Sequence, residues 1–175
     1  MKIVRRKDDD TPDKDVESSQ ESTEQKSSVA DLLRSLAADE LISYHAYTTG
    51  ARLLTGSGWM DVNQEFTAHA KEELEHYEAI LTRLWQLGEP VPTVFKSIPD
   101  MASYYWDIEV ESPEEAAKIA LESEKHAVEA YKKLLVFISN QSADEKDFVT
   151  QKLAKSHLET EQEHFQDMQH LVDEF

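Results

Sequence analysis

Two eight-residue segments decide the fold class of this chain. Residues 69–76 read HAKEELEH and residues 157–164 read HLETEQEH, so both follow the pattern His-x3-Glu-x2-His. Residues three and four apart lie on one face of an α-helix, and each segment therefore places a carboxylate, Glu73 or Glu161, between two imidazoles. The repeated pattern predicts two equivalent helices with the same chemistry on one face.

Two further stretches carry a related pattern, Glu40-x6-Tyr47 and Glu124-x6-Tyr131. In all four stretches an alternating three- and four-residue spacing marks the face that packs in a bundle core. Each face contains apolar residues or tyrosine and a single glutamate. Glu122 and Glu129 fall off this face, which favours Glu124.

Four buried carboxylates must be neutralised, because an isolated buried charge is costly and like charges repel. The four faces contain no Lys or Arg. Two divalent cations would balance the four charges, and oxygen ligands with imidazole suit iron or manganese. The sequence therefore predicts a metal centre.

Capping residues and glycines indicate where these helices begin and end. The two short loops make the first pair and the last pair antiparallel, whereas residues 89–111 are long enough to travel the length of a bundle, with Tyr104, Tyr105 and Trp106 packed on its outside. The prediction is an all-α four-helix bundle with one long crossover between helices two and three. The expected helices cover residues 28–54, 61–88 (capped by Asp61), 112–139, and 147 to near the C-terminus.

Composition limits the partners. Among 175 residues, 36 are acidic and 18 basic, a net charge of −18, which argues against broad contact with nucleic acid. The longest apolar run has five residues (134–138), so no membrane span is expected, and a cytoplasmic location is the default.

Residues 1–27 are predicted to be a disordered polar tail, and residues 28–175 one bundle domain. The tail carries a basic cluster, residues 2–7, but its acids outnumber its basic residues, so DNA binding is not favoured.

The motifs resemble those of the ferritin-like superfamily, and most closely those of bacterioferritin and the bacterioferritin-type Dps-like mini-ferritins. The resemblance implies a ferritin-like bundle with two iron ions per subunit. It also implies outer ligands at Glu40 and Glu124, bridging carboxylates at Glu73 and Glu161, and nitrogen ligands at His76 and His164. The residues that carry the resemblance are Asp39-Glu40-Leu41, Glu73-x-x-His76, Glu124-x-x-Ala127 with Tyr131, and Asp147-x-Val149-Thr150 followed by Glu161-x-x-His164.

Departures from the bacterioferritin pattern refine this expectation. Leu74 stands where bacterioferritin has its haem-binding methionine, so no haem is expected. The sequence ends eleven residues after His164, without room for the fifth helix of twenty-four-subunit ferritins. A homo-oligomeric shell of twelve subunits is therefore favoured.

Several residues keep two interpretations. Tyr47 and Tyr131 either orient carboxylates and donate an electron, or are ordinary core tyrosines. His69 and His157 either are additional metal or entry-path ligands, or are hydrogen-bonded buried histidines. Surface positions without a role are expected for His45, His126 and His170, and a solvated face for Glu72, Glu75 and Glu163.

The leading functional hypothesis is a ferroxidase that oxidises Fe(II) with O₂ or H₂O₂ and stores ferric mineral in the shell, in defence against oxidative stress. One alternative is a non-storage dimetal enzyme of the manganese catalase or oxygenase type. Others are a DNA-protecting shell of the Dps type and a structural bundle with a vestigial site.

Overall fold

A computed structural model describes residues 28–104 and 112–175. This part of the chain is helical and contains no strand, which confirms the predicted fold class. The predicted tail, residues 1–27, lies outside the described residues. The elements are α1 (Val29–Leu53), α2 (Trp59–Gln86), the 3₁₀ helix η1 (Phe95–Ser97), the short α3 (Ile98–Met101), α4 (Pro113–Ser139) and α5 (Phe148–Glu174).

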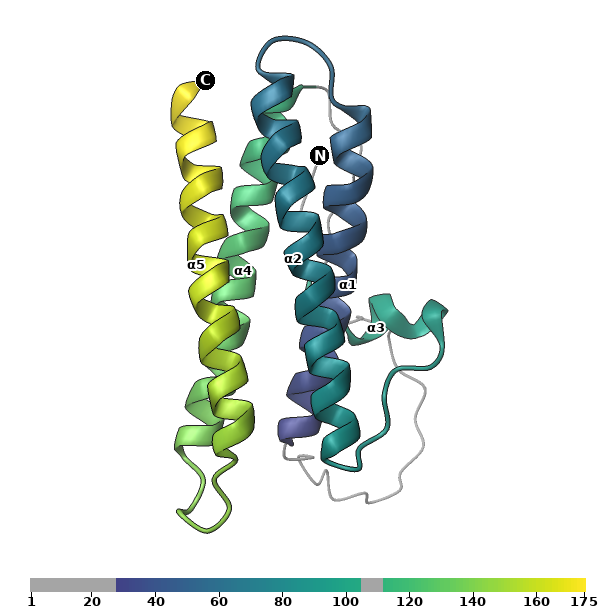
Figure 1. The fold of residues 1–175 in the computed structure, drawn as a ribbon, viewed down its shortest axis with the longest axis vertical. Helices are drawn as coiled ribbons and strands as arrows, with labels where there is room; N and C mark the ends of the chain where they lie inside the picture. Colours follow the sequence, from purple (N-terminus) through teal and green to yellow (C-terminus); the bar gives the residue numbers. More distant parts are fainter. Residues whose placement is uncertain (1–27, 105–111) are drawn as a thin grey trace, which may run out of the picture.

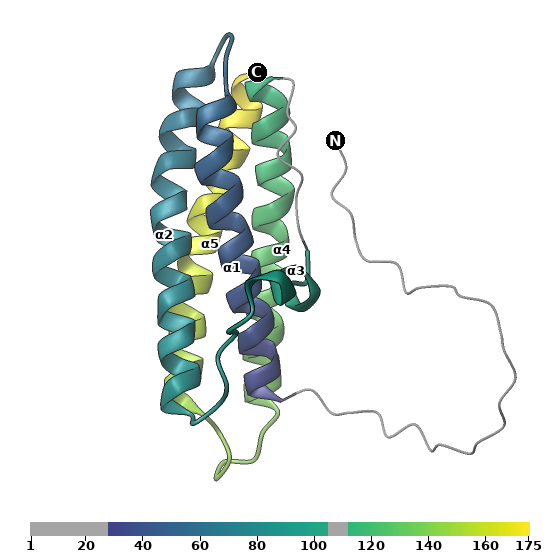
Figure 2. The same ribbon diagram turned by 90° about the vertical axis from the view of Figure 1, so that its right-hand side faces the viewer.

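The four long helices form a bundle of two antiparallel pairs (Figure 1). A short loop joins α1 to α2 at one end, and another joins α4 to α5 at the opposite end. Consequently α4 runs parallel to α2, as the long crossover between them requires (Figure 2). The crossover differs from a plain loop in containing η1 and α3, and α3 packs against α1.

Side chains cap three of the long helices, and two of these caps, at Ser28 and Ser112, were predicted. Ser28 and Asp31 form a capping box at α1, the Ser112 hydroxyl accepts from the amide of Glu115 at α4, and Asp147 caps α5. The predicted cap at Asp61 is wrong, because α2 begins two residues earlier. Gly58, at φ 76°, turns the chain into α2, and the Phe175 ring leaves no space for a Cβ there.

A polar layer divides the apolar core into two parts. On α1, one part ends at Ala37 and the other begins at Ala46, and the buried polar residues Asp39, Glu40 and Ser43 lie between them. Gly50 belongs to the second part, where a Cβ at this position would lie 3.0 Å from the Phe66 ring. Close helix packing thus explains the one glycine inside a long helix.

Buried hydrogen bonds attach the crossover to α1 at the level of this polar layer. The Asp39 carboxylate accepts from the amide and the hydroxyl of Ser103, at 2.6 and 2.8 Å. The hydroxyls of Ser43 and Tyr104 lie 2.9 Å apart, and Tyr104 is buried in the core and does not lie on the outside. Tyr105 and Trp106, expected to pack outside the bundle, lie beyond the described residues. None of the described helices is both long and apolar enough to cross a membrane.

Candidate metal centre

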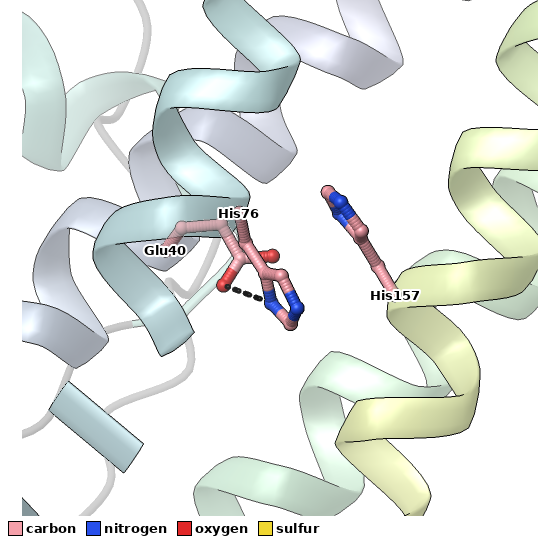
Figure 3. A group of neighbouring side chains, drawn as sticks. All are labelled: Glu40, His76 and His157. Atoms are coloured by element: carbon pink, nitrogen blue, oxygen red, sulfur yellow. Dashed lines mark ion pairs between the residues drawn. The ribbon is translucent and has the colours of Figure 1, made fainter. Parts of the chain in front are cut away.

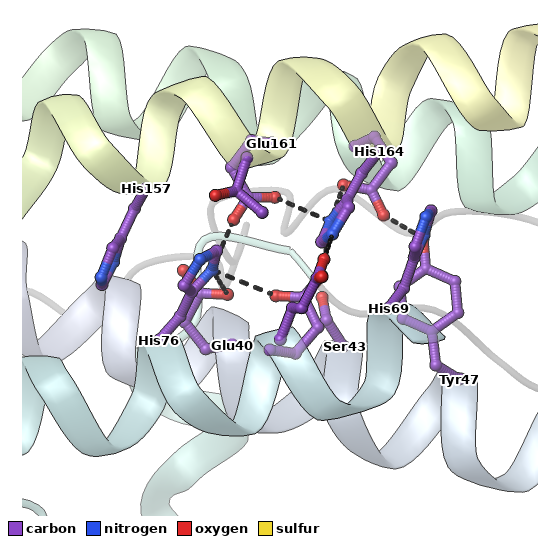
Figure 4. A network of polar contacts seen from close by, with 12 residues as sticks. Glu40, Ser43, Tyr47, His69, His76, His157, Glu161 and His164 are labelled. Atoms are coloured by element: carbon purple, nitrogen blue, oxygen red, sulfur yellow. Dashed lines mark hydrogen bonds and ion pairs between the residues drawn. The ribbon is translucent and has the colours of Figure 1, made fainter. Parts of the chain in front are cut away.

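The four glutamates of the predicted faces meet in the polar layer. Figure 4 labels two of them, Glu40 and Glu161. The four residues come from the four long helices, Glu40 from α1, Glu73 from α2, Glu124 from α4 and Glu161 from α5, and each is at most 2% exposed. The three- and four-residue spacing brings them together, because it places each glutamate on the face of its helix that is turned toward the bundle axis.

The carboxylates and two histidines form two overlapping groups. Glu40 and His76 form the first group with Glu73 and Glu161, and Glu124 and His164 form the second with the same two glutamates. Within each group the ligand atoms lie within 4.8 Å of one another. Glu73 and Glu161 belong to both groups, so the geometry is that of two adjacent cation positions with two shared carboxylates.

Both histidines turn Nδ1 toward the carboxylates. His76 Nδ1 lies 2.8 Å from Glu161 and 3.8 Å from both Glu40 and Glu73. His164 Nδ1 repeats this arrangement at 3.4 Å from Glu73, 3.7 Å from Glu161 and 3.8 Å from Glu124. Each cluster half therefore offers one nitrogen and several oxygen ligands.

Several of these atoms have no hydrogen-bond partner among the described residues. They are Nδ1 of His76 and of His164, Oε2 of Glu73 and both oxygens of Glu161. Buried polar atoms are nearly always hydrogen-bonded, so a group of such atoms that contact only one another as ion pairs, around one small region, fits a bound cation. Iron and manganese, the two metals that the donor residues predict from the sequence, therefore fit this site.

Each tyrosine reaches across the bundle to a glutamate of the other helix pair. The Tyr47 hydroxyl of α1 donates to Glu124, and the Tyr131 hydroxyl of α4 donates to Glu40. Tyr131 also lies 2.9 Å from His157 Nδ1. Both tyrosines are fully buried, and both hold a carboxylate of the cluster in place.

The remaining two predicted histidines cover the ends of the cluster. His157 stacks on His76 with ring centroids 4.0 Å apart (Figure 3), and His69 stacks on His164 at 3.9 Å. His157 also forms a possible ligand group with Glu40 and His76, as His69 does with Glu124 and His164. The structure thus places all ten predicted site residues in one buried region.

Without metal, protons compensate the negative charge of the cluster. Burial raises the pKa of Glu73 well above its usual range, and the carboxylates of Glu161 and Glu40 raise it further. Burial also opposes ionisation of Glu40, but hydrogen bonding with Glu73 and His76 outweighs it and lowers the pKa of Glu40 to about 2. Burial opposes protonation of His76 as well, yet the carboxylates of Glu161 and Glu40 raise its pKa to about 10.

The second half of the cluster behaves similarly. Burial opposes protonation of His164, but Glu124, Glu161 and Glu73 raise its pKa far above the usual range. Burial and the neighbouring His164 charge lower the pKa of His69 to about 4, and burial and the His76 charge do the same to His157. Each stack therefore pairs a protonated imidazole with a neutral one near neutral pH.

Sequence reasoning missed one residue of this region, Glu72. Its side chain is exposed, which confirms the predicted solvated face, but its carboxylate lies 2.5 Å from His164 Nε2, a contact that the sequence did not predict. Glu72 is off the core face, so the periodicity of the sequence gave no signal for this contact. His126, predicted at the surface, is half-buried against Tyr104. The other surface predictions are confirmed, because His45, Glu75, Glu163 and His170 are exposed.

Solved structures share this fold. The dodecameric thioferritin of Bacteroides fragilis, a bacterioferritin-related protein, is 27% identical, with a TM-score of 0.77 over 83% of this chain and 84% of that chain. Dps from Thermosynechococcus elongatus is 14% identical, with a TM-score of 0.76 over 82% of this chain and 89% of that chain. The second likeness concerns the fold alone.

A curated relative and a family pattern extend the similarity to the sequence. The DNA protection during starvation protein of Pyrococcus furiosus is 29% identical over 136 residues, which cover 77% of this chain and 71% of that protein. The pattern of the ferritin-like domain matches residues 30–175, nearly the whole described part. The resemblance seen in the motifs is confirmed, and the chain belongs to the ferritin-like domain family.

Proposed function

We propose that the protein is a ferroxidase that stores or detoxifies iron. One observation carries the proposal: two groups of buried ligand atoms share Glu73 and Glu161, and many of these atoms have no hydrogen-bond partner among the described residues. Shared carboxylates hold two cations close together, which suits the removal of one electron from each.

Each residue has a defined part in binding ferrous iron as substrate. Glu40 with His76 would hold one ion and Glu124 with His164 the other, while Glu73 and Glu161 would bridge them. The hydrogen bonds from Tyr131 to Glu40 and from Tyr47 to Glu124 would fix the orientation of the outer carboxylates.

The reaction transfers electrons from iron to an oxidant. Two ferrous ions give up two electrons, which reduce O₂ to H₂O₂, or H₂O₂ to water, with uptake of two protons in either case. His76, His164 and Glu73 hold protons in the metal-free cluster and release them when iron binds. Iron is the favoured metal, and manganese suits the same ligands.

Storage requires a shell, and exposed apolar side chains support subunit contacts. Trp85 is 75% exposed, Phe95 79% and Met60 65% in the isolated chain. The thioferritin at 27% identity is dodecameric by its description. A twelve-subunit homo-oligomer is the form that we propose, and light scattering of the purified protein tests it. A stable monomer or dimer that retains no mineral would contradict storage.

The site is tested by replacing both shared carboxylates, Glu73→Ala with Glu161→Ala. We expect aerobic oxidation of Fe(II), followed by ferric absorbance, to fall by at least about 100-fold, because both cation positions lose their bridge. The matched control, Glu75→Ala with Glu163→Ala, removes one exposed glutamate from each of the same helices and keeps the rate. Wild-type rates in the first variant would disprove the assignment.

DNA protection is a second candidate, because the relative from Pyrococcus furiosus is named for it. Its sequence basis here is the basic cluster at residues 2–7, which lies outside the described residues. A gel shift at low salt, with the full chain and with a chain lacking residues 1–26, tests it. A shift that only the full chain produces would support DNA binding through the tail, and no shift in either would exclude it.

A further inference from the structure

We propose that His69, Glu65 and Asp167 form a third divalent-cation site, beside a surface pocket that Glu65 and Asp167 line, at the end of the metal centre that Glu124 and His164 form. The site itself is independent of the ferroxidase proposal. Its role as the entry point for ferrous iron rests on that proposal.

The geometry of the three side chains is that of an open cation site. His69 Nε2 lies 3.9 Å from the Glu65 carboxylate and 3.6 Å from that of Asp167. Metal bonds of about 2.1 Å place neighbouring ligand atoms about 3 Å apart, so a small movement of the two acids closes the site. Such movement is available, because the Glu65 and Asp167 side chains are 31% and 48% exposed.

His69 supplies the evidence that a ligand belongs there. It is 2% exposed, and neither ring nitrogen has a hydrogen-bond partner among the described residues. A buried imidazole normally satisfies at least one nitrogen, and this one instead directs Nε2 toward two carboxylates. A neutral imidazole with two carboxylates is a donor set that Fe²⁺, Mn²⁺, Co²⁺ and Zn²⁺ all accept.

Glu65 and Asp167 line a pocket on the surface. It has a volume of about 250 Å³, and its lining includes Glu65 and Asp167 together with Asp61 and Glu174. Four carboxylates around one opening raise the local concentration of cations. Figure 4 shows His69 at the end of the cluster beside His164, opposite the end that His157 covers. His69 also belongs to a ligand group with Glu124 and His164, so it lies between the pocket and the metal centre.

The opposite end of the cluster lacks this arrangement. Aligning the two repeated segments on their central glutamates matches Glu65 with Leu153, and aligning them on the last histidines matches Asp167 with Ala79. His157 instead has a partner for Nδ1, the Tyr131 hydroxyl at 2.9 Å. The two halves are therefore alike at the metal centre and different outside it. Among the described residues of the two ends, the His69 end combines an imidazole that has no hydrogen-bond partner with two surface acids.

The test counts Co²⁺ ions bound per chain by equilibrium dialysis of the assembled protein. We expect about three for wild type and about two for Glu65→Gln with Asp167→Asn. The control, Glu75→Gln with Glu163→Gln, makes the same change of charge on the same two helices and keeps three. Equal counts in wild type and the first variant would overturn the site.

The variant Glu73→Ala with Glu161→Ala separates this inference from the proposed function. It should keep one Co²⁺, which is lost when Glu65→Gln and Asp167→Asn are added.

The role of the site as the entry point for Fe(II) has its own test. Glu65→Gln with Asp167→Asn should slow iron oxidation by about tenfold at limiting Fe(II) and leave the rate at saturating Fe(II) unchanged. An unchanged rate at limiting iron together with a lost Co²⁺ would overturn the entry role alone. Normal oxidation by the Glu73→Ala and Glu161→Ala protein would instead overturn the ferroxidase assignment.

Discussion

His69 stacks on His164 with ring centroids 3.9 Å apart and 20° between the ring planes, and His157 stacks on His76 in nearly the same way. The inner ring of each stack faces the carboxylates and is protonated in the metal-free protein, whereas the outer ring is neutral. The flanking neutral ring shields the cationic one from water and holds its plane. The stacks therefore prepare Nδ1 of both inner histidines for metal.

Metal-free protein should lose stability as pH rises above about 6.5. The carboxylates of Glu161 and Glu40 outweigh burial and raise the pKa of His76 to about 10, so protonated His76 stabilises the fold below pH 6.5, and this stability is lost as pH rises toward 10. On the acid side the contributions oppose one another. Protonation of His69 and His157, whose pKa values burial and the adjacent charged imidazole lower to about 4, destabilises the fold, whereas protonation of Asp39, whose pKa burial raises to about 7, stabilises it. Thermal unfolding with a chelator at about pH 6.5 and 9 measures the alkaline decline. Added Co²⁺ should remove this decline, since metal replaces the protons; a metal-free stability that does not fall between about pH 6.5 and 9 would contradict the assignment.

Glu72→Gln should weaken metal binding at the His164 position. The Glu72 carboxylate lies 2.5 Å from His164 Nε2 and fixes which nitrogen faces the centre, and loss of such a partner typically lowers affinity about 10- to 100-fold. Calorimetric titration with Co²⁺ measures the change. Glu75→Gln, an exposed neighbour on α2, serves as the control and should bind as wild type does.

Tyr131→Phe should affect both the fold and the chemistry. The substitution removes the hydroxyl that donates to Glu40 and contacts His157, and a hydrogen bond to a charged group contributes about 1.5–3 kcal/mol. We expect the free energy of unfolding to fall by this amount in chelator, and the rate of Fe(II) oxidation to fall as well. Tyr77→Phe, at a half-buried position on α2, is the control. If both variants behave alike, Tyr131 is an ordinary core residue.

Gly50→Ala should destabilise the bundle although alanine favours helices. The added Cβ would lie 3.0 Å from the Phe66 ring, and overpacking of this kind costs about 1–3 kcal/mol. Chemical denaturation measures the loss. The double variant with Phe66→Leu should recover part of it, since the smaller side chain makes room; no recovery would show that Phe66 is not the obstacle.

Asp147→Ala should loosen the contact between the end of α2 and the start of α5. Asp147 caps α5 by accepting from the Thr150 amide at 2.9 Å, and both its oxygens lie 2.8 Å from Arg83 Nη2. Loss of cap and ion pair together should cost about 2 kcal/mol or more. Asp147→Asn keeps a cap and loses the charge, so thermal unfolding should place it between wild type and Asp147→Ala. Equal losses in the two variants would show that the cap contributes nothing.

Much of the fold follows from local patterns. Spacing of apolar residues predicted four long helices, and capping at Ser28 and Ser112 located two of their beginnings, because a cap acts within one turn. The start of α2 was misplaced because its cap is a glycine in a left-handed conformation, for which Asp61 offered a conventional but incorrect alternative. The crossover helices η1 and α3 are too short to leave a periodic signal.

For the candidate site, too, local patterns predicted some features and contacts between helices decided the others. The sequence by itself determined which residues share a helix face, and hence that Glu40, Glu73, Glu124 and Glu161 turn toward one axis, because helical geometry follows from spacing alone. Only the tertiary structure decided which groups touch across helices: Tyr47 with Glu124, Tyr131 with Glu40, and Glu72 with His164. These pairs are 77, 91 and 92 residues apart, and their contact depends on the rotation and height of one helix against another, which side-chain packing sets and no local pattern records.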